Sequence, residues 1–165
     1  MKDSAQFGLT YLVEVIRDGV VIDREEVHNL VPTQGLNHIL NVEFKATTQV
    51  TAWYLAIFEG NYVPTSADTA AALPAAATES TAYAESTRVL FVGGTVAGGV
   101  LDNSASRAEF TMNAAKTIYG AFMTSAPAKG ATTGVVISSV RFSAAKNLVA
   151  TDILRITAGM TLTSS

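Results

Sequence analysis

Few residues of this chain have the chemistry for a metal or catalytic site, and their spacing forms no recognisable pattern. The two histidines are His28 and His38, and the nearest acidic residues are Asp23, Glu25 and Glu26. This arrangement matches no established set of metal ligands, and solvated charges on a strand explain it more simply. We therefore expect no metal site.

Catalysis is poorly supported as well. No Gly-x-Ser-x-Gly motif occurs, and the adjacent carboxylates Glu25 and Glu26 would point to opposite faces of a strand, so they could not act on one substrate. The glycine pairs at 93–94 and 98–99 are not a phosphate-binding loop, because Val100-Leu101 follows where Gly-Lys-Ser/Thr is needed. We read them as turns and expect no enzymatic activity and no cofactor.

The composition fits a single domain, residues 1–165, with unusually few charges. Hydrophobic residues make up 48% of the chain and charged residues 15%, whereas about a quarter of a soluble protein is usually charged. Much of the surface must then consist of Ala, Thr, Ser and Gly. Such a surface suits burial between subunits, because the cores of protein interfaces are depleted in charge.

The charge pattern and the lack of long apolar runs exclude further classes of partner. The net charge is -3 and Lys and Arg are scattered singly, so we expect no nucleic-acid binding. No cysteine is present, which permits folding in a reducing cytoplasm. The first residues lack the apolar stretch of a signal peptide, and no run of about 18 apolar residues occurs. We expect no membrane span.

Residues 7–28 predict an N-terminal β-hairpin, because two β-rich runs flank Asp18-Gly19, a strong turn signal. A two-residue turn would place Glu14 opposite an aspartate, and like charges directly opposite each other are unfavourable. A three-residue loop with a glycine bulge would instead pair Val15 with Val21. We favour the bulged loop.

A short helix and a central strand follow the hairpin. Pro32-Thr33-Gln34 predicts a helix start, and the helix would carry an apolar face of Leu36, Ile39, Leu40 and, if it extends that far, Phe44. The run from Trp53 to Phe58 (WYLAIF) is apolar on both faces, which is typical of a central strand covered on both sides.

Residues 64–87 form an irregular segment rich in Ala, Thr and Ser. A helical turn from Asp68 to Leu73, stopped by Pro74, is the one regular feature that we expect in it. The segment is longer than an ordinary connection, so it is either a functional loop or a segment that a partner orders. Tyr62 and Tyr83 flank it, and each could anchor it to the domain or insert into a neighbouring subunit.

The remainder reads as short strands separated by turns. Strands are expected at residues 88–92, 107–112, 117–124, 135–142 and 153–162, and apolar and polar residues alternate in the last of these. Eight or nine strands at this spacing, with one short helix, predict a mainly β protein, either a β-sandwich or a barrel. We favour the sandwich.

Several runs of the sequence resemble small virion structural proteins of tailed bacteriophages, often encoded near the major capsid protein. The longest runs are residues 14–19 (EVIRDG), 29–40 (NLVPTQGLNHIL) and 53–60 (WYLAIFEG), and shorter ones are 69–71, 83–88 and 129–134. Together they extend over most of the chain, from about Tyr11 to Leu162. The resemblance implies a jelly-roll-like sandwich, with no catalytic residues, made in the host cytoplasm and located in the virion.

Within this group, the resemblance implies a capsid cement, or decoration, protein that binds the major capsid protein as a homo-oligomer. The alternative is a tail or fibre component involved in host receptor binding. A carbohydrate-binding or hydrolytic sandwich is a third reading, but the sole tryptophan, Trp53, lies in an apolar strand. We expect the hairpin and residues 64–87 to reach neighbouring subunits, because each would lie at the periphery. The candidate subunit contacts are Arg17, Asp18, Tyr62 and Tyr83.

Overall fold

The computed structural model describes residues 5–164, which form two helices and nine strands. The helices are α1 (Thr33–Phe44) and α2 (Leu73–Ala76). The strands are β1 (Ala5–Arg17), β2 (Val20–His28), β3 (Trp53–Phe58), β4 (Val89–Phe91), β5 (Val100–Asp102), β6 (Ala108–Thr111), β7 (Lys116–Thr124), β8 (Val136–Leu148) and β9 (Ile153–Ser164).

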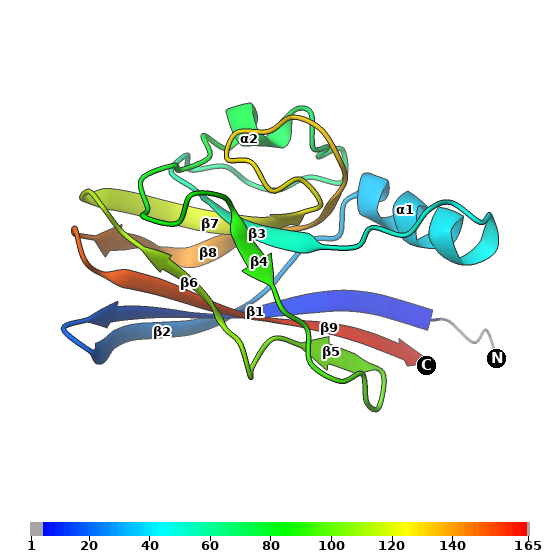
Figure 1. Cartoon of the computed structure of the whole chain (residues 1–165), viewed down its shortest axis with the longest axis horizontal. Coiled ribbons are helices and arrows are strands. Elements are labelled where there is room, and N and C mark those ends of the chain that lie inside the picture. The colour runs from blue at the N-terminus through cyan, green and yellow to red at the C-terminus, as the bar shows by residue number, and fades with distance from the viewer. Residues whose placement is uncertain (1–4, 165) are drawn as a thin grey trace.

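Two antiparallel sheets face each other and enclose the main hydrophobic core (Figure 1). The first sheet has the order β2-β1-β9-β5, with β6 also paired to β9, and the second has the order β4-β3-β7-β8. The predicted mainly β fold and the β-sandwich are therefore confirmed. Neither helix within residues 5–164 is long and apolar enough to cross a membrane.

The strand faces follow the alternation of the sequence. In β9, Leu154 and Ile156 are buried between the sheets, while the intervening Arg155 points outward. The strand β3 is central, as predicted, because β4 and β7 flank it. Its alternate residues enter two different clusters. Leu55 and Ile57 belong to the main core, whereas Ala56 and Phe58 join a smaller cluster on the other face of the second sheet.

The turn between β1 and β2 has two residues, so the predicted three-residue loop is wrong. Asp18 has a φ of 50° and Gly19 a φ of 77°, and both are therefore left-handed. Two left-handed central residues are the geometry of a type I′ turn, whose twist matches that of the flanking strands. Arg17 consequently faces Val20 across the turn.

A bulge further along the hairpin changes the register. Val21 faces Ile16, and the register then shifts, which makes Ile22 the extra residue of β2. Beyond this bulge Glu14 faces Arg24 rather than an aspartate. Glu14 is thus kept away from an aspartate partner, as expected, but the bulge at Ile22 achieves this and the turn does not.

The hairpin is not peripheral, which corrects a second expectation. The strand β1 lies in the middle of its sheet between β2 and β9, and the side chains of Leu9, Tyr11, Val13 and Val15 are buried in the main core. Only the turn and β2 lie at the edge (Figure 1). The hairpin is therefore part of the framework of the sandwich.

The helix α1 lies where the sequence predicts it, and packing explains why residue 35 of this helix is a glycine. A Cβ atom added at Gly35 would lie 3.0 Å from the backbone of Val136 and Ile137, so glycine allows α1 to pack closely on β8. Gln34 continues this attachment, because its Oε1 accepts hydrogen bonds from the amides of Ala70 (3.0 Å) and Val136 (2.9 Å).

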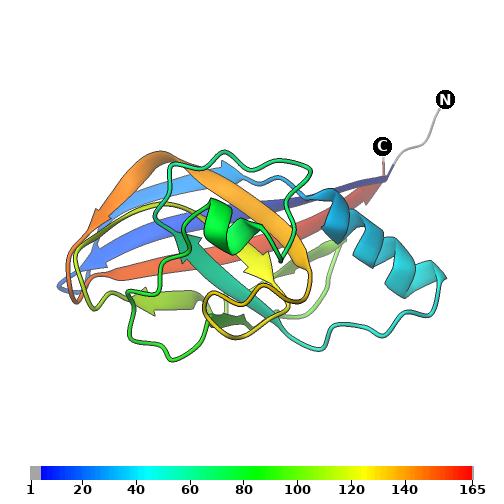
Figure 2. The same ribbon diagram turned by 90° about the horizontal axis from the view of Figure 1, so that it is seen from above.

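The segment of residues 64–87 lies over the second sheet, with α2 at its centre (Figure 2). The predicted helical turn before Pro74 is present, since the amide of Leu73 donates to the carbonyl oxygen of Thr69 at 2.9 Å, but Pro74 does not stop it. The helix α2 begins at Leu73 and contains that proline in its first turn. A proline is tolerated there since its missing N–H would have no helical partner. Ala70, Leu73 and Ala77 are buried against Phe58, so the segment is a second, short layer of the domain.

Candidate functional site

Two of the four predicted contact residues lie at the β1–β2 turn. Asp18 is exposed, whereas Arg17 is half-buried and donates from Nε and Nη2 to the two carboxylate oxygens of Asp152, at 2.8 and 2.7 Å. These hydrogen bonds from Arg17 hold the pKa of Asp152 below its ordinary value. The guanidinium of Arg17 therefore ties β1 to the turn before β9 within this chain.

The other two predicted contact residues, Tyr62 and Tyr83, contact residues of their own domain. Tyr83 is only 1% exposed, stacks edge-on against Phe110 at 5.1 Å and lies under the ammonium of Lys129 at 3.6 Å. Burial raises the pKa of its hydroxyl. Tyr62 donates a 2.6 Å hydrogen bond to Asp68. Tyr83 is thus wrong as a subunit contact.

A buried ion pair, which the sequence did not reveal, holds the end of the 64–87 segment. Arg88 donates to both carboxylate oxygens of Glu79, at 2.9 and 2.7 Å, and to the carbonyl oxygens of Ala126 and Ala131, both at 3.0 Å. Its guanidinium also lies over the ring of Phe122. The segment is therefore anchored at this end by contacts within its own chain.

The two histidines lie apart from each other. His28 is exposed on β2, where its Nδ1 lies 3.3 Å from the hydroxyl of Thr10. His38 is on α1 and meets the ring of Trp53 edge-on at 5.7 Å. Within residues 5–164, no three side chains of His, Cys, Asp or Glu are grouped so that they could share a metal ion.

The helix α1 exposes most of its predicted apolar face. Leu36 is 42% exposed, Leu40 is 55% exposed and Phe44 is 77% exposed, and their spacing of four residues aligns them along the helix. We call these three residues the helix stripe. Of the predicted face, only Ile39 packs against the main core. The helix stripe therefore faces solvent in the isolated chain.

An apolar groove lies beside α1, at the same end of the molecule. Its volume is about 300 Å³. Trp53 lines it and is half-buried, although its apolar strand led us to expect an enclosed side chain. The other apolar lining residues are Phe7, Ile39, Val42, Val50, Ile137, Met160 and Leu162, with His38, Glu43 and Gln49 as the polar ones. Because this lining is mostly apolar, the groove suits an apolar side chain better than a sugar.

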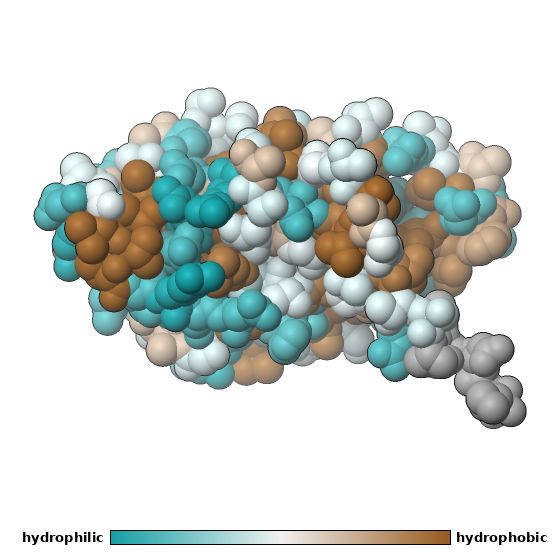
Figure 3. All heavy atoms as spheres, turned by 90° about the horizontal axis from the view of Figure 1, so that it is seen from below, coloured by the Kyte–Doolittle hydropathy of each residue, from teal (hydrophilic) through white to brown (hydrophobic). Residues whose placement is uncertain are grey.

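A second apolar area lies at the opposite end of the molecule. Val20, Val21 and Ile22, at the start of β2, are 62%, 44% and 52% exposed. Figure 3, which looks onto the outer face of the first sheet, shows apolar surface at both ends and hydrophilic side chains between them. This outer face therefore carries apolar ends and a hydrophilic middle.

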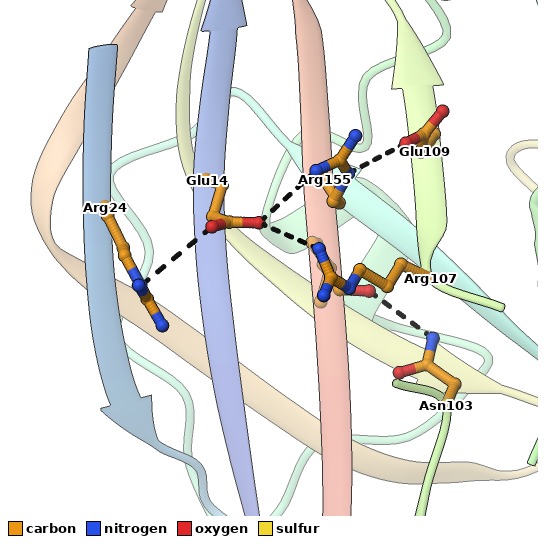
Figure 4. Close-up of polar contacts among 7 residues, drawn as sticks. Glu14, Arg24, Asn103, Arg107, Glu109 and Arg155 are labelled. Atoms are coloured by element: carbon orange, nitrogen blue, oxygen red, sulfur yellow. Dashed lines mark hydrogen bonds and ion pairs between the residues drawn. The ribbon is translucent and has the colours of Figure 1, made fainter. Parts of the chain in front are cut away.

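The outer face of the first sheet also carries a cluster of three arginines around one buried glutamate (Figure 4). Glu14, on β1, is 7% exposed. Arg24 from β2, Arg107 from the loop before β6 and Arg155 from β9 approach its carboxylate to 3.9, 3.8 and 3.7 Å. We call these three residues the arginine cluster. Arg155 also donates a 2.8 Å hydrogen bond to Glu109 of β6.

Comparison with known proteins adds no relative to this picture. Neither the protein-family models nor the curated proteins that were searched match the chain.

Proposed function

We propose that this protein is a structural component of a tailed-bacteriophage particle, and specifically a cement protein that binds major capsid subunits as a homo-oligomer. The observation that carries the proposal is the exposed helix stripe of α1. A helix that is apolar toward solvent as well as toward its own domain is usually covered by something else. The sequence resemblance supplies the class of partner.

The position of the helix stripe supports a docking role. The stripe lies on the same helix as Ile39 and Val42, which line the groove beside α1, so one end of the sandwich offers both a ridge and a hollow of apolar character. Large apolar side chains that fill pockets at the centre of an interface contribute most of the binding energy. A rigid sandwich with such an end can bridge two capsid subunits without chemistry of its own.

Sedimentation with capsids that lack this protein tests the proposal. The wild type should co-sediment with the particles and raise their resistance to heat. The double variant Leu40→Ser with Phe44→Ser should stay folded, with an unchanged circular-dichroism spectrum, and should remain in the supernatant. Val149→Ser is the matched control, because Val149 is 45% exposed in the β8–β9 turn, away from α1.

Two outcomes would contradict the proposal. If the double variant binds capsids as tightly as the wild type, the helix stripe is not the docking surface. If the wild type has no affinity for capsids and is found at the tail, the alternative of a tail or fibre component takes its place.

A further inference from the structure

We infer that the arginine cluster on the outer face of the first sheet binds carboxylate groups of an acidic protein segment. The inference deepens the proposed function, on which it rests for taking the partner to be a protein of the particle. It names the chemistry that the partner's surface must carry, and it stands on a different face of the molecule from the helix stripe.

The first step is that the arginines have unused hydrogen-bond donors. A guanidinium group has five N–H donors in a planar fork. Arg24 and Arg107 donate no hydrogen bond to any other residue between 5 and 164, and they approach Glu14 only at ion-pair distances of 3.9 and 3.8 Å. Their side chains are 64% and 44% exposed, so these donors are open to a partner.

The second step is that the cluster is not explained as a stabilising device of the isolated chain. Arg24 and Arg107 are themselves well exposed and lie beyond hydrogen-bond distance of Glu14, so each contributes only weakly to stability. Glu14 nevertheless gives up hydration, and its buried Oε2 accepts no hydrogen bond within the described part of the chain. What Glu14 does accomplish is to hold three guanidinium groups together on one face, which reduces the entropy lost when a partner binds them.

The third step is the sign and size of the local charge. The three positive charges of the arginine cluster exceed by one the two negative charges that contact them, those of Glu14 and Glu109. Glu26 lies two residues from Arg24 on the same face, but it forms no ion pair with the cluster. Arginine forks match the two oxygens of a carboxylate. The chain as a whole carries a charge of -3 and its other basic residues are scattered, so the extended basic track that a nucleic-acid backbone requires is missing.

The flanking rows of the sheet also fit a protein segment. On one side of the row that contains Glu14, Val21 faces Ile16 and Ile16 faces Ile153, which makes an apolar row. On the other side Leu12 faces Glu26 and Thr157. A partner segment with an acidic residue over the arginine cluster and an apolar one over the Ile16 row would place each group against its complement, whereas an acidic residue on the other side would face Glu26.

The test is a titration of the intact protein with a capped hexaglutamate peptide at about 0.1 M salt. NMR signals of the arginine Nε–Hε groups report the binding. The peptide should bind saturably and shift the signals of Arg24 and Arg107. Arg24→Gln and Arg107→Gln should each weaken binding at least about fivefold, as expected for the loss of a charge-assisted fork. Arg141→Gln is the matched control, since Arg141 is exposed on β8 of the other sheet.

The contrary outcomes are equally specific. The inference fails if the peptide does not bind saturably, or if Arg141→Gln weakens binding as much as the cluster variants do. It also fails if a thymidine hexanucleotide binds as tightly as the peptide through the same arginines, because the surface would then recognise phosphates. None of these outcomes depends on capsid binding by α1, so either proposal can fail alone.

Discussion

Replacing Arg88 with methionine tests how the 64–87 segment is held to the domain. The side chain of Arg88 is 0% exposed and that of its partner Glu79 is 3% exposed. Methionine keeps much of the volume but leaves the Glu79 carboxylate and two backbone carbonyl groups without their donor. Removing one partner of a buried ion pair costs about 3–5 kcal/mol. In a domain of this length, that loss should lower the Tm by about 6–20 °C.

Urea denaturation, followed by circular dichroism, measures the change in the free energy of unfolding. Lys116→Met is the matched control, because Lys116 and Glu59 form an ion pair of 2.9 Å whose side chains are 35% and 25% exposed. We expect this control to lose less than about 1 kcal/mol. Combining Arg88→Met with Glu79→Leu should recover much of the loss, since no buried charge is then left unpaired.

A loss below about 1 kcal/mol for Arg88→Met would refute this reasoning. It would mean that the ion pair between Arg88 and Glu79 does not hold the segment, and that the segment can leave the second sheet at little cost. Residues 64–87 would then again be candidates for a segment that a partner orders.

Three further predictions concern stability. Because Arg17 lowers the pKa of Asp152, their interaction stabilises the fold above about pH 4 and is lost as the pH falls through the folded-state pKa. Asp152→Asn should therefore lower the free energy of unfolding at neutral pH but differ little from the wild type in acid. Urea titrations at both pH values measure this difference. Gly120→Ala should destabilise the protein by about 3 kcal/mol or more, because the added Cβ would collide with an aromatic ring and a backbone oxygen across the sheet; Gly8→Ala, where the added atom meets no described atom within 4 Å, should fold normally. Trp53→Ala should lower the free energy of unfolding by about 2 kcal/mol, less than the roughly 3–5 kcal/mol for a fully buried tryptophan, because Trp53 is half-buried and lines the groove. Thermal unfolding followed by circular dichroism measures this loss.

The strands could be predicted because one face of each strand is buried and the other is not, so apolar and polar residues alternate along the sequence. In β6, Ala108 and Phe110 are buried while Glu109 is not, as the alternation predicts. The central position of β3 was equally readable, since a strand that is covered on both faces must be apolar on both.

The candidate surfaces could not be predicted, because they depend on register and on distant contacts. The helical spacing of Leu36 and Leu40 indicates an apolar face, but the close approach of Gly35 to Ile137, about a hundred residues away, turns that face toward solvent. The arginine cluster depends on the bulge at Ile22, since a slip of one residue would move every side chain of β2 to the other face.

The molar ratio of this protein to the major capsid protein in purified phage particles tests the central claim most directly. Quantitative mass spectrometry of particles from density gradients would give that ratio. A cement protein should be present at a copy number comparable to that of the major capsid protein, and should leave the particles when the helix stripe of α1 is disrupted. If the protein is absent from the particles, or is present only at the small copy number of a tail component, the cement proposal is wrong.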